Sequence, residues 1–276
     1  MRSPLLESSA RRDRAVMNSD QIKRFWDKQA SSEGASRLGC HSDPHLVELE
    51  NWFIIEKCLR RFSPNKLLDV GCGNGKRTKL LSRYAREETV GIDYSDKMIG
   101  LARKLENRKL HFSCDDILDL NHLKAAYNRF DCIISCRCLI NLGSTKNQRQ
   151  AIANVHKLLN RNGLFVLCEG SMRGTIELNS LRLMLGLNPI TPIPANLDIE
   201  EAVILPWIHR KFRIINSANF GWYYLLTRAY YPALVFPKDP NPRSKWNKLA
   251  ARLVIKMDED YPRFGRHLCL LLQKKN

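Results

Sequence analysis

The stretch LLDVGCGNGKRT, residues 67–78, decides how this sequence is interpreted. An apolar run passes into a glycine-rich turn, and a helical segment follows at once. Gly71, Gly73 and Gly75 permit a tight turn and a close approach of the backbone to a ligand. Asp93 ends the next apolar run, 20 residues after Gly73, where a carboxylate accepts hydrogen bonds from ribose hydroxyls. The stretch therefore predicts a nucleotide-like cofactor at a strand-to-helix turn.

The spacing of the glycines separates the alternatives. Lys76 stands where the dinucleotide fingerprint GxGxxG has its third glycine, which disfavours a nicotinamide-binding domain. The phosphate-loop pattern GxxxxGK[ST] is absent from the sequence, which argues against an ATP-type site.

Apolar runs alternate with helical segments around this motif. The strand-like runs cover 65–70, 89–93, 109–114, 130–135, 163–169, 211–216 and 267–275, and the helical segments 20–30, 46–62, 76–86, 95–106 and 147–160. Nearly continuous apolar strands separated by helices are typical of a parallel sheet covered on both faces. We predict an α/β fold with a doubly wound, mostly parallel, seven-stranded sheet. A helical lid is expected after the fifth strand and between the last two strands.

The expected organisation has four parts. Residues 1–19 read as a disordered basic arm and residues 20–62 as helices that cover the cofactor. Residues 63–170 form the cofactor-binding core. The remainder, 171–276, holds the last two strands and the lid.

The chain of 276 residues has a formal net charge of +17. Such an excess favours an anionic partner, which is a nucleic acid, a membrane surface or a phosphorylated substrate. A solvated basic surface is the alternative, because the charge is spread along the chain.

Nine cysteines occur, and none lies in a CxxC pair. Most stand in apolar runs, as reduced cysteines do in a cytoplasmic protein. The sequence has no apolar run of roughly 20 residues, so no membrane span is expected. The stretch SCRCLINL, residues 135–142, lacks the paired spacing of zinc ligands, and no metal site is predicted.

Five motifs together resemble the class I S-adenosylmethionine-dependent methyltransferases. They are LLDVGCGNG, VGIDYS, FSCDDI, FDCIISCRCLINL and LLNRNGLFVLCEG, in the family's order over about residues 65–170. The resemblance implies S-adenosyl-L-methionine as the cofactor and a Rossmann-like fold.

The resemblance also implies the residues that meet this cofactor. The glycine loop borders the methionine part, Asp93 holds the ribose, and Asp115 or Asp116 meets the adenine amine. Trp26 either closes over the cofactor or anchors its own helix. The full set is Trp26, Asp69, Gly71, Cys72, Gly73, Asn74, Gly75, Asp93, Tyr94, Met98, Asp115, Asp116, Ile117, Ser135 and Cys136.

Candidates for the chemistry follow the fourth and fifth strands, since ligands lie beyond the carboxyl ends of the strands. Glu169 is a candidate base, or else the partner of an arginine. Arg137 is a candidate to hold a phosphate or carboxylate of the acceptor, or to fix Glu169. Asn141 and His45 are further catalytic candidates, and His45 has a structural alternative. The acceptor-binding candidates in the lid are Asn179, Arg182, Tyr223 and Tyr224.

A narrower resemblance, carried by SCRCLINL, CEGSMRGTIELNSLRLMLGLNPI and NFGWYYLLTR, is to a bacterial subgroup associated with polysaccharide or small-molecule biosynthesis. It implies methyl transfer to a hydroxyl of a small polar acceptor, a sugar or glycan, with an anionic acceptor as an option. Metal-independent transfer is expected, because the aspartate and the Asp-Asn pair of metal-dependent O-methyltransferases are absent after the fourth and fifth strands. One alternative is a methyltransferase of RNA or another nucleic acid, which the charge favours although the base-methylation motif [DNS]PP[YFW] is absent. Another is a cofactor-binding partner protein without catalysis.

Overall fold

The computed structural model describes residues 17–31, 42–120, 123, 129–238, 240–258, 261 and 263–275. Nearly all of the expected basic arm, residues 1–19, lies outside the described residues. The first described helix is α2 (Ser19–Ala30), and its start is fixed by a reciprocal pair of hydrogen bonds between Asn18 and Gln21. This capping box explains why the helix begins where the apolar pattern begins.

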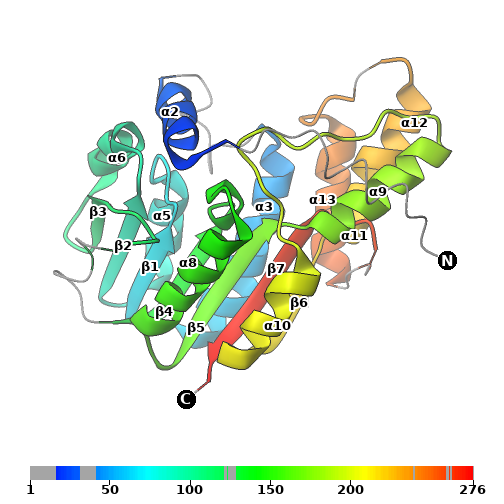
Figure 1. Cartoon of the computed structure of the whole chain (residues 1–276). Coiled ribbons are helices and arrows are strands. Elements are labelled where there is room, and N and C mark those ends of the chain that lie inside the picture. Colours follow the sequence, from blue (N-terminus) through cyan, green and yellow to red (C-terminus); the bar gives the residue numbers. More distant parts are fainter. Residues whose placement is uncertain are drawn as a thin grey trace.

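Seven strands form one sheet in the order β3-β2-β1-β4-β5-β7-β6 (Figure 1). Their bounds are β1 (Lys66–Val70), β2 (Glu88–Asp93), β3 (Leu110–Cys114), β4 (Phe130–Cys136), β5 (Leu159–Gly170), β6 (Phe212–Ala218) and β7 (His267–Lys274). The first five strands are parallel, and β7 runs antiparallel to both of its neighbours. The predicted α/β fold with a mostly parallel, seven-stranded sheet is therefore confirmed. The strand order reverses between β1 and β4, which is where such sheets bind ligands.

Both faces of the sheet are covered, because alternate residues of its central strands point to opposite sides. On β4, Ile134 and Cys136 belong to the core beneath the N-terminal helices, and Ile133 belongs to the core beneath α8 and α10. The helices along the sheet are α3 (Pro44–Trp52), η3 (Phe53–Leu59), α4 (Arg60–Phe62), α5 (Lys76–Leu81), η4 (Ser82–Tyr84), α6 (Asp96–Ala102), η5 (Arg103–Leu105), α8 (Thr145–Leu158) and α10 (Glu201–Lys211). None of the described helices is long and apolar enough to span a bilayer.

The segments expected to form the lid have two different positions. Helix α10 packs beside α8 on the sheet, because Ile204 and Ile208 reach the same core as Val155, so this part of 171–211 covers the sheet and not the strand ends. The other insertions, α9 (Met172–Met184), α11 (Gly221–Tyr224), η7 (Leu225–Tyr230), α12 (Tyr231–Val235) and α13 (Lys245–Met257), gather beside α3 at one end of the molecule (Figure 1).

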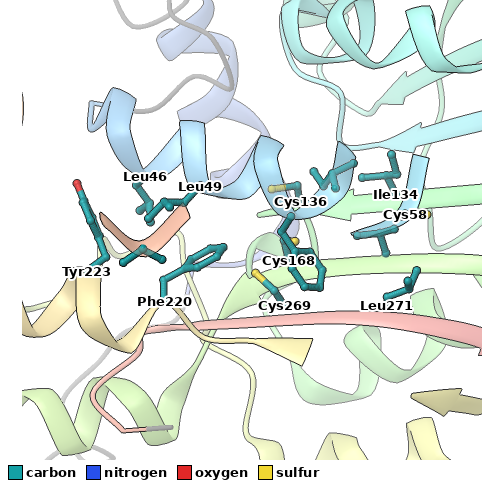
Figure 2. Close-up of a cluster of buried hydrophobic side chains, with 14 of the residues drawn as sticks. Leu46, Leu49, Cys58, Ile134, Cys136, Cys168, Phe220, Tyr223, Cys269 and Leu271 are labelled. Atoms are coloured by element: carbon teal, nitrogen blue, oxygen red, sulfur yellow. The ribbon is translucent and has the colours of Figure 1, made fainter. Parts of the chain in front are cut away.

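Cysteines form part of the core between the sheet and α3–η3 (Figure 2). Cys136, Cys168 and Cys269 are register partners on β4, β5 and β7, so their side chains share one face of the sheet. The sulfurs of Cys58 and Cys132 lie 3.8 Å apart in the same core. The cysteines of the described segments are free, and no group of metal-ligand type is found there. The thiols thus act as small apolar side chains in tight packing.

Candidate functional site

A cavity of about 460 Å³ opens beyond the carboxyl ends of β1, β2, β3 and β4. Its walls come from the turns after these strands, from α2, and from the segment between α9 and α10. The predicted site residues that line it are Trp26, Asp69, Gly71, Cys72, Gly73, Asp93, Tyr94, Met98, Asp115, Asp116, Ile117, Cys136, Arg137 and Asn141. The fold therefore brings most of the expected cofactor residues to one chamber.

The glycine turn needs glycine for its backbone shape. Gly71 has φ +72°, and a Cβ added there would lie 2.6 Å from the Cβ of Cys138. The N–H groups of Gly71 and Cys72 both donate to the carbonyl of Ile92, at 2.8 and 2.9 Å. Asn74 and Gly75 lie behind the turn: Asn74 is buried and accepts from the N–H of Lys76. These two residues shape the loop from outside the wall of the cavity.

Two carboxylates, the buried Asp69 and the partly buried Asp93, stand below and beside the turn. Asp93 accepts hydrogen bonds from the N–H groups of Gly73 and Ser95, each at 2.9 Å. Burial raises the pKa of the Asp93 carboxyl to about 6, against the lowering effect of these two donors. Asp69 accepts from the hydroxyl of Thr78 at 2.6 Å, and burial also raises its pKa to about 6. Asp93 thereby fixes the glycine turn to the end of β2.

The two aspartates after β3 differ in their contacts. Asp115 uses both carboxylate oxygens for backbone donors, the N–H of Asp116 at 3.0 Å and the N–H of Leu123 at 2.7 Å. Asp116 accepts from the N–H of Leu118 through Oδ1, and burial raises its pKa. Opposite them, the hydroxyl of Tyr94 is buried without a hydrogen-bond partner among the described residues. Asp115 thus accepts backbone hydrogen bonds through both carboxylate oxygens, and Asp116 accepts one through Oδ1.

Glu169 has a different environment from the one expected of a base. It is fully buried, and it accepts hydrogen bonds from the hydroxyl of Ser135 at 2.7 Å and from the N–H groups of Cys138, Leu139 and Ile140 at 3.0–3.2 Å. Burial raises the pKa of Glu169 to about 7, although these donors act in the opposite direction. Among the described residues, Glu169 and Ser135 do not line the cavity, and the carboxylate of Glu169 holds the loop after β4. Arg137 pairs with Glu50, and Arg182 donates to backbone carbonyls.

A buried charge network centred on Glu50 joins this loop to the rest of the molecule. The Glu50 carboxylate is 0% exposed and pairs with Arg77, with Nε of Arg137 at 3.2 Å, and with Nε2 of His267 at 3.0 Å. The other ring nitrogen of His267 lies 2.7 Å from the hydroxyl of Tyr224. Burial alone would raise the pKa of Glu50, but Arg137, Arg77 and His267 outweigh it and hold the pKa well below its usual range.

Trp26 and Asn141 meet across the mouth of the cavity. The indole Nε1 of Trp26 donates to Oδ1 of Asn141 at 3.2 Å, and Nδ2 of Asn141 donates to the carbonyl of Arg137 at 2.8 Å. Arg137 itself has φ +59°, so its loop turns back sharply toward the cavity. Helix α2 is thereby tied to the loop after β4.

The acceptor candidates chosen from the lid have structural partners. Tyr223 donates to Asp43, the N-cap of α3, at 2.9–3.0 Å, and Tyr224 contacts His267 as above. Asn179 holds the backbone of Ile190 through two hydrogen bonds, and Arg182 donates to the carbonyls of Asn188 and Arg228. Nδ1 of His45 lies 3.6 Å from Oε2 of Glu48. In the part of the chain that is described, none of these five candidates lines the cavity.

Other residues line the cavity where these five candidates were expected. Thr191, Pro192, Ile193 and Asn196 line the cavity from the segment that Asn179 holds, and Arg266 lines it from just before β7. Arg77 also reaches the wall, although the sequence reasoning assigned it no role. Glu50 stands among apolar residues in LVELENWFII, and a charged residue on a buried helix face is the signal that would have indicated it.

Comparison with known proteins agrees with this geometry. Residues 67–163 match the family described as "Methyltransferase domain". The uncharacterized protein RP028 of Rickettsia prowazekii is 27% identical over 44% of this chain and 48% of its own length. O-methyltransferase cnsE of Penicillium expansum is 29% identical over 40% of each chain. The chain thus spans less than half the length of these curated relatives.

Among solved structures, the N-methyltransferase NodS of Bradyrhizobium japonicum WM9, in complex with S-adenosyl-L-homocysteine, is similar with a TM-score of 0.59. The similarity covers 92% of this chain and 99% of NodS at 14% identity, and it concerns the fold. Residues 67–163 therefore match a methyltransferase domain, and the sheet that contains them has the fold of a methyltransferase whose structure holds S-adenosyl-L-homocysteine. Neither the kind of acceptor nor the narrower bacterial subgroup follows from these matches.

Proposed function

We propose that the protein transfers a methyl group from S-adenosyl-L-methionine to an oxygen of a small, polar and negatively charged acceptor. The observation that carries this proposal is that one cavity holds both the glycine turn with Asp93 and a group of arginine side chains. Arg77, Arg137 and Arg266 all line it. A cofactor and an anionic acceptor would therefore share one chamber.

The residues present fit the cofactor. The turn at Gly71 has no room for a side chain, so its backbone is open to the methionine part of a ligand. Asp93 would accept from the ribose hydroxyls and Asp116 from the adenine amine, while the unpartnered hydroxyl of Tyr94 is available beside them. When bound, S-adenosyl-L-methionine supplies an electrophilic methyl group. Trp26 and Asn141 would close the chamber and exclude water.

Arginines at the acceptor end support a negatively charged acceptor. Glu50 pairs with both Arg77 and Arg137, so two guanidinium groups share one carboxylate there. Arg266 adds a further positive charge, and its Nε donates to the hydroxyl of Thr175 at 3.1 Å. Guanidinium groups bind carboxylate and phosphate with directed hydrogen bonds. A sugar acid or a phosphorylated sugar, methylated on a hydroxyl, has the required polarity and charge.

The test is incubation of the protein with methyl-labelled cofactor and a metabolite extract, followed by anion exchange and mass spectrometry of the labelled products. The expected product is a small anion that carries one labelled O-methyl group. Labelled RNA in place of a small product would contradict the proposal. Binding of the cofactor without any transfer would instead identify a silent partner protein.

Two variants separate the cofactor from the acceptor. Asp93→Ala should weaken binding of S-adenosyl-L-homocysteine by at least about tenfold, because it loses a charged acceptor for the ribose. Arg266→Gln should raise the KM for the identified acceptor and leave cofactor affinity within about twofold. If Arg266→Gln weakens cofactor binding instead, this arginine holds the carboxylate of the cofactor, and the assignment to the acceptor is wrong.

A further inference from the structure

The outer face of α13 has an unusual composition for a solvent-facing helix. Leu249, Leu253 and Met257 are 63%, 44% and 37% exposed, and their spacing of four residues places them in one row. A second row beside it holds the exposed cations Lys248, Arg252 and Lys256. The opposite side of the helix packs into the core through Ala250, Ala251 and Val254. An exposed helix face is ordinarily polar throughout, so the apolar row requires an explanation.

The apolar surface continues onto the neighbouring helix. Tyr230, Leu234 and Phe236 are 53%, 63% and 67% exposed. The ring of Trp246, in the first turn of α13, stacks on Tyr230 and on Tyr231 with centroid separations of 6.2 and 5.8 Å. These contacts join α12 to the start of α13, and both lie at the end of the molecule away from β3 and α6 (Figure 1).

This surface is also strongly basic. From residue 231, where α12 begins, to residue 257, where α13 ends, the only acidic residue of the sequence is Asp239, whereas the basic ones are Lys238, Arg243, Lys245, Lys248, Arg252 and Lys256; an acidic run, residues 258–260, follows the helix. Across the described residues, no ion pair joins a carboxylate to the exposed cations of α13 or of the turn before it. A concentration of positive charge without acidic partners favours an anionic ligand.

We propose that the surface formed by α12 and α13 docks the protein on a bilayer that contains anionic phospholipids. Exposed leucine, methionine and phenylalanine side chains would enter the boundary between headgroups and acyl chains, while lysines and arginines would meet lipid phosphates. A nucleic acid would use the cations, but it offers no apolar layer for Leu249, Leu253 and Phe236. A protein partner would use the apolar row, and it would need an unusually acidic complement.

The surface is connected to the wall of the cavity through α9 and the segment that follows it. Arg182, near the end of α9, donates to the carbonyl of Arg228 on η7 and to the carbonyl of Asn188. The segment that begins there reaches Thr191, Pro192 and Ile193 at the cavity. The end of α9, where Met184 is 77% exposed, lies beside α12, and the chain runs back from there to the wall of the cavity (Figure 1). Docking does not depend on the proposed acceptor, and the two ideas can fail separately.

The experiment is vesicle flotation of the full chain with phosphatidylcholine alone, or with about 30% phosphatidylglycerol, over about 50 to 500 mM salt. We expect the protein to bind the vesicles that contain phosphatidylglycerol and not those of phosphatidylcholine alone. The binding should weaken as the salt concentration increases. The double variant Lys248→Glu/Arg252→Glu should bind at least about tenfold more weakly. Leu249→Ser/Leu253→Ser should lose binding by a similar factor without any change in charge.

The matched control is Lys97→Glu/Lys104→Glu, which makes the same charge change on α6 and η5 at the other end of the sheet. It should bind vesicles as the unchanged protein does, and all variants should retain affinity for S-adenosyl-L-homocysteine as evidence of folding. If the control variant lost vesicle binding to the same extent, the effect would come from the net charge of the protein and not from α13, and the proposal would be overturned. Absence of vesicle binding, or RNA binding that the α13 charge variant abolishes, would also overturn it.

Discussion

The indole Nε1 of Trp26 donates to Oδ1 of Asn141 at 3.2 Å and joins the first described helix to the loop after β4. Both side chains line the cavity, so this bond connects two of its walls. It holds α2 over the cavity. Trp26 is therefore tied to the site and does not serve only as an anchor of its own helix.

Trp26→Phe keeps an aromatic ring and removes the N–H donor. We expect affinity for S-adenosyl-L-homocysteine to fall about two- to tenfold, because one hydrogen bond that holds α2 over the cavity is lost. Isothermal titration measures this directly. Lys28→Ala, on the exposed side of the same helix, is the control and should change nothing. Unchanged affinity in Trp26→Phe would show that α2 does not need this bond.

Cofactor affinity should depend on pH through Asp93. Its pKa is raised to about 6, so the carboxylate is ionised above that pH and becomes protonated as the pH falls through it. A ribose hydroxyl donates better to the ionised form, and affinity should decline by up to about tenfold per pH unit below 6. Asp93→Asn should bind weakly and lose most of this dependence. If cofactor affinity kept the same pH dependence in Asp93→Asn, the titrating group would be Asp69 and not Asp93.

Glu50→Gln should strongly destabilise the protein. It removes the one carboxylate that Arg77, Arg137 and His267 share, and breaking a buried pair costs about 3–5 kcal/mol in free energy of unfolding. Chemical denaturation measures the loss. Glu48→Gln, two residues away in the same helix and half exposed, should cost less than about 1 kcal/mol. Similar losses in both variants would mean that the buried network is not the source.

Glu169→Gln tests whether this residue shapes a loop or acts as a base. Because burial raises the pKa of Glu169 from 4.5 to about 7, its contribution to stability is complete below pH 4.5 and is lost as the pH rises through 7. The unchanged protein should therefore lose about 3 kcal/mol more than the variant between pH 4.5 and 8. Thermal unfolding across that range measures the difference. With the acceptor known, a kcat that falls more than about a hundredfold in the variant, with stability preserved, would restore the role of base.

Gly71→Ala and Gly100→Ala make the same substitution at two different glycines. At Gly71 the left-handed backbone and the 2.6 Å approach to Cys138 forbid a methyl group, and both stability and cofactor affinity should fall. At Gly100, within α6, no atom lies within 4 Å of the added Cβ, so the variant should be more stable by about 0.5–1 kcal/mol. Thermal melts with and without S-adenosyl-L-homocysteine distinguish the two effects. A Gly71→Ala protein that binds the cofactor normally would contradict the proposed position of the loop.

The parts that could be predicted from the sequence are those set by local pattern. The motif at 67–78 and the alternation of strands and helices gave the sheet, and each turn after a strand supplied its cofactor candidates. Hydrogen bonds between residues that are far apart in the sequence have no local sequence pattern that could predict them. Glu169 could not be recognised as the acceptor for the N–H groups of Cys138 and Leu139, because the curl of that loop is a tertiary property. Tyr223 likewise was a candidate to bind the acceptor, although its hydroxyl donates a hydrogen bond to Asp43.

His267 contacts Glu50 across 217 positions of the chain, and it does so from the first residue of the last strand. The network that holds Arg77 and Arg137 around Glu50 is therefore complete only after β7 has joined the sheet. During synthesis, the glycine turn and β1 to β5 would emerge from the ribosome well before β7 could complete the network around Glu50. A chain cut before β7 would keep its glycine turn and yet lose the His267 contact to the carboxylate that holds Arg77 and Arg137, so the arginines of the cavity wall depend on a strand far away in the sequence.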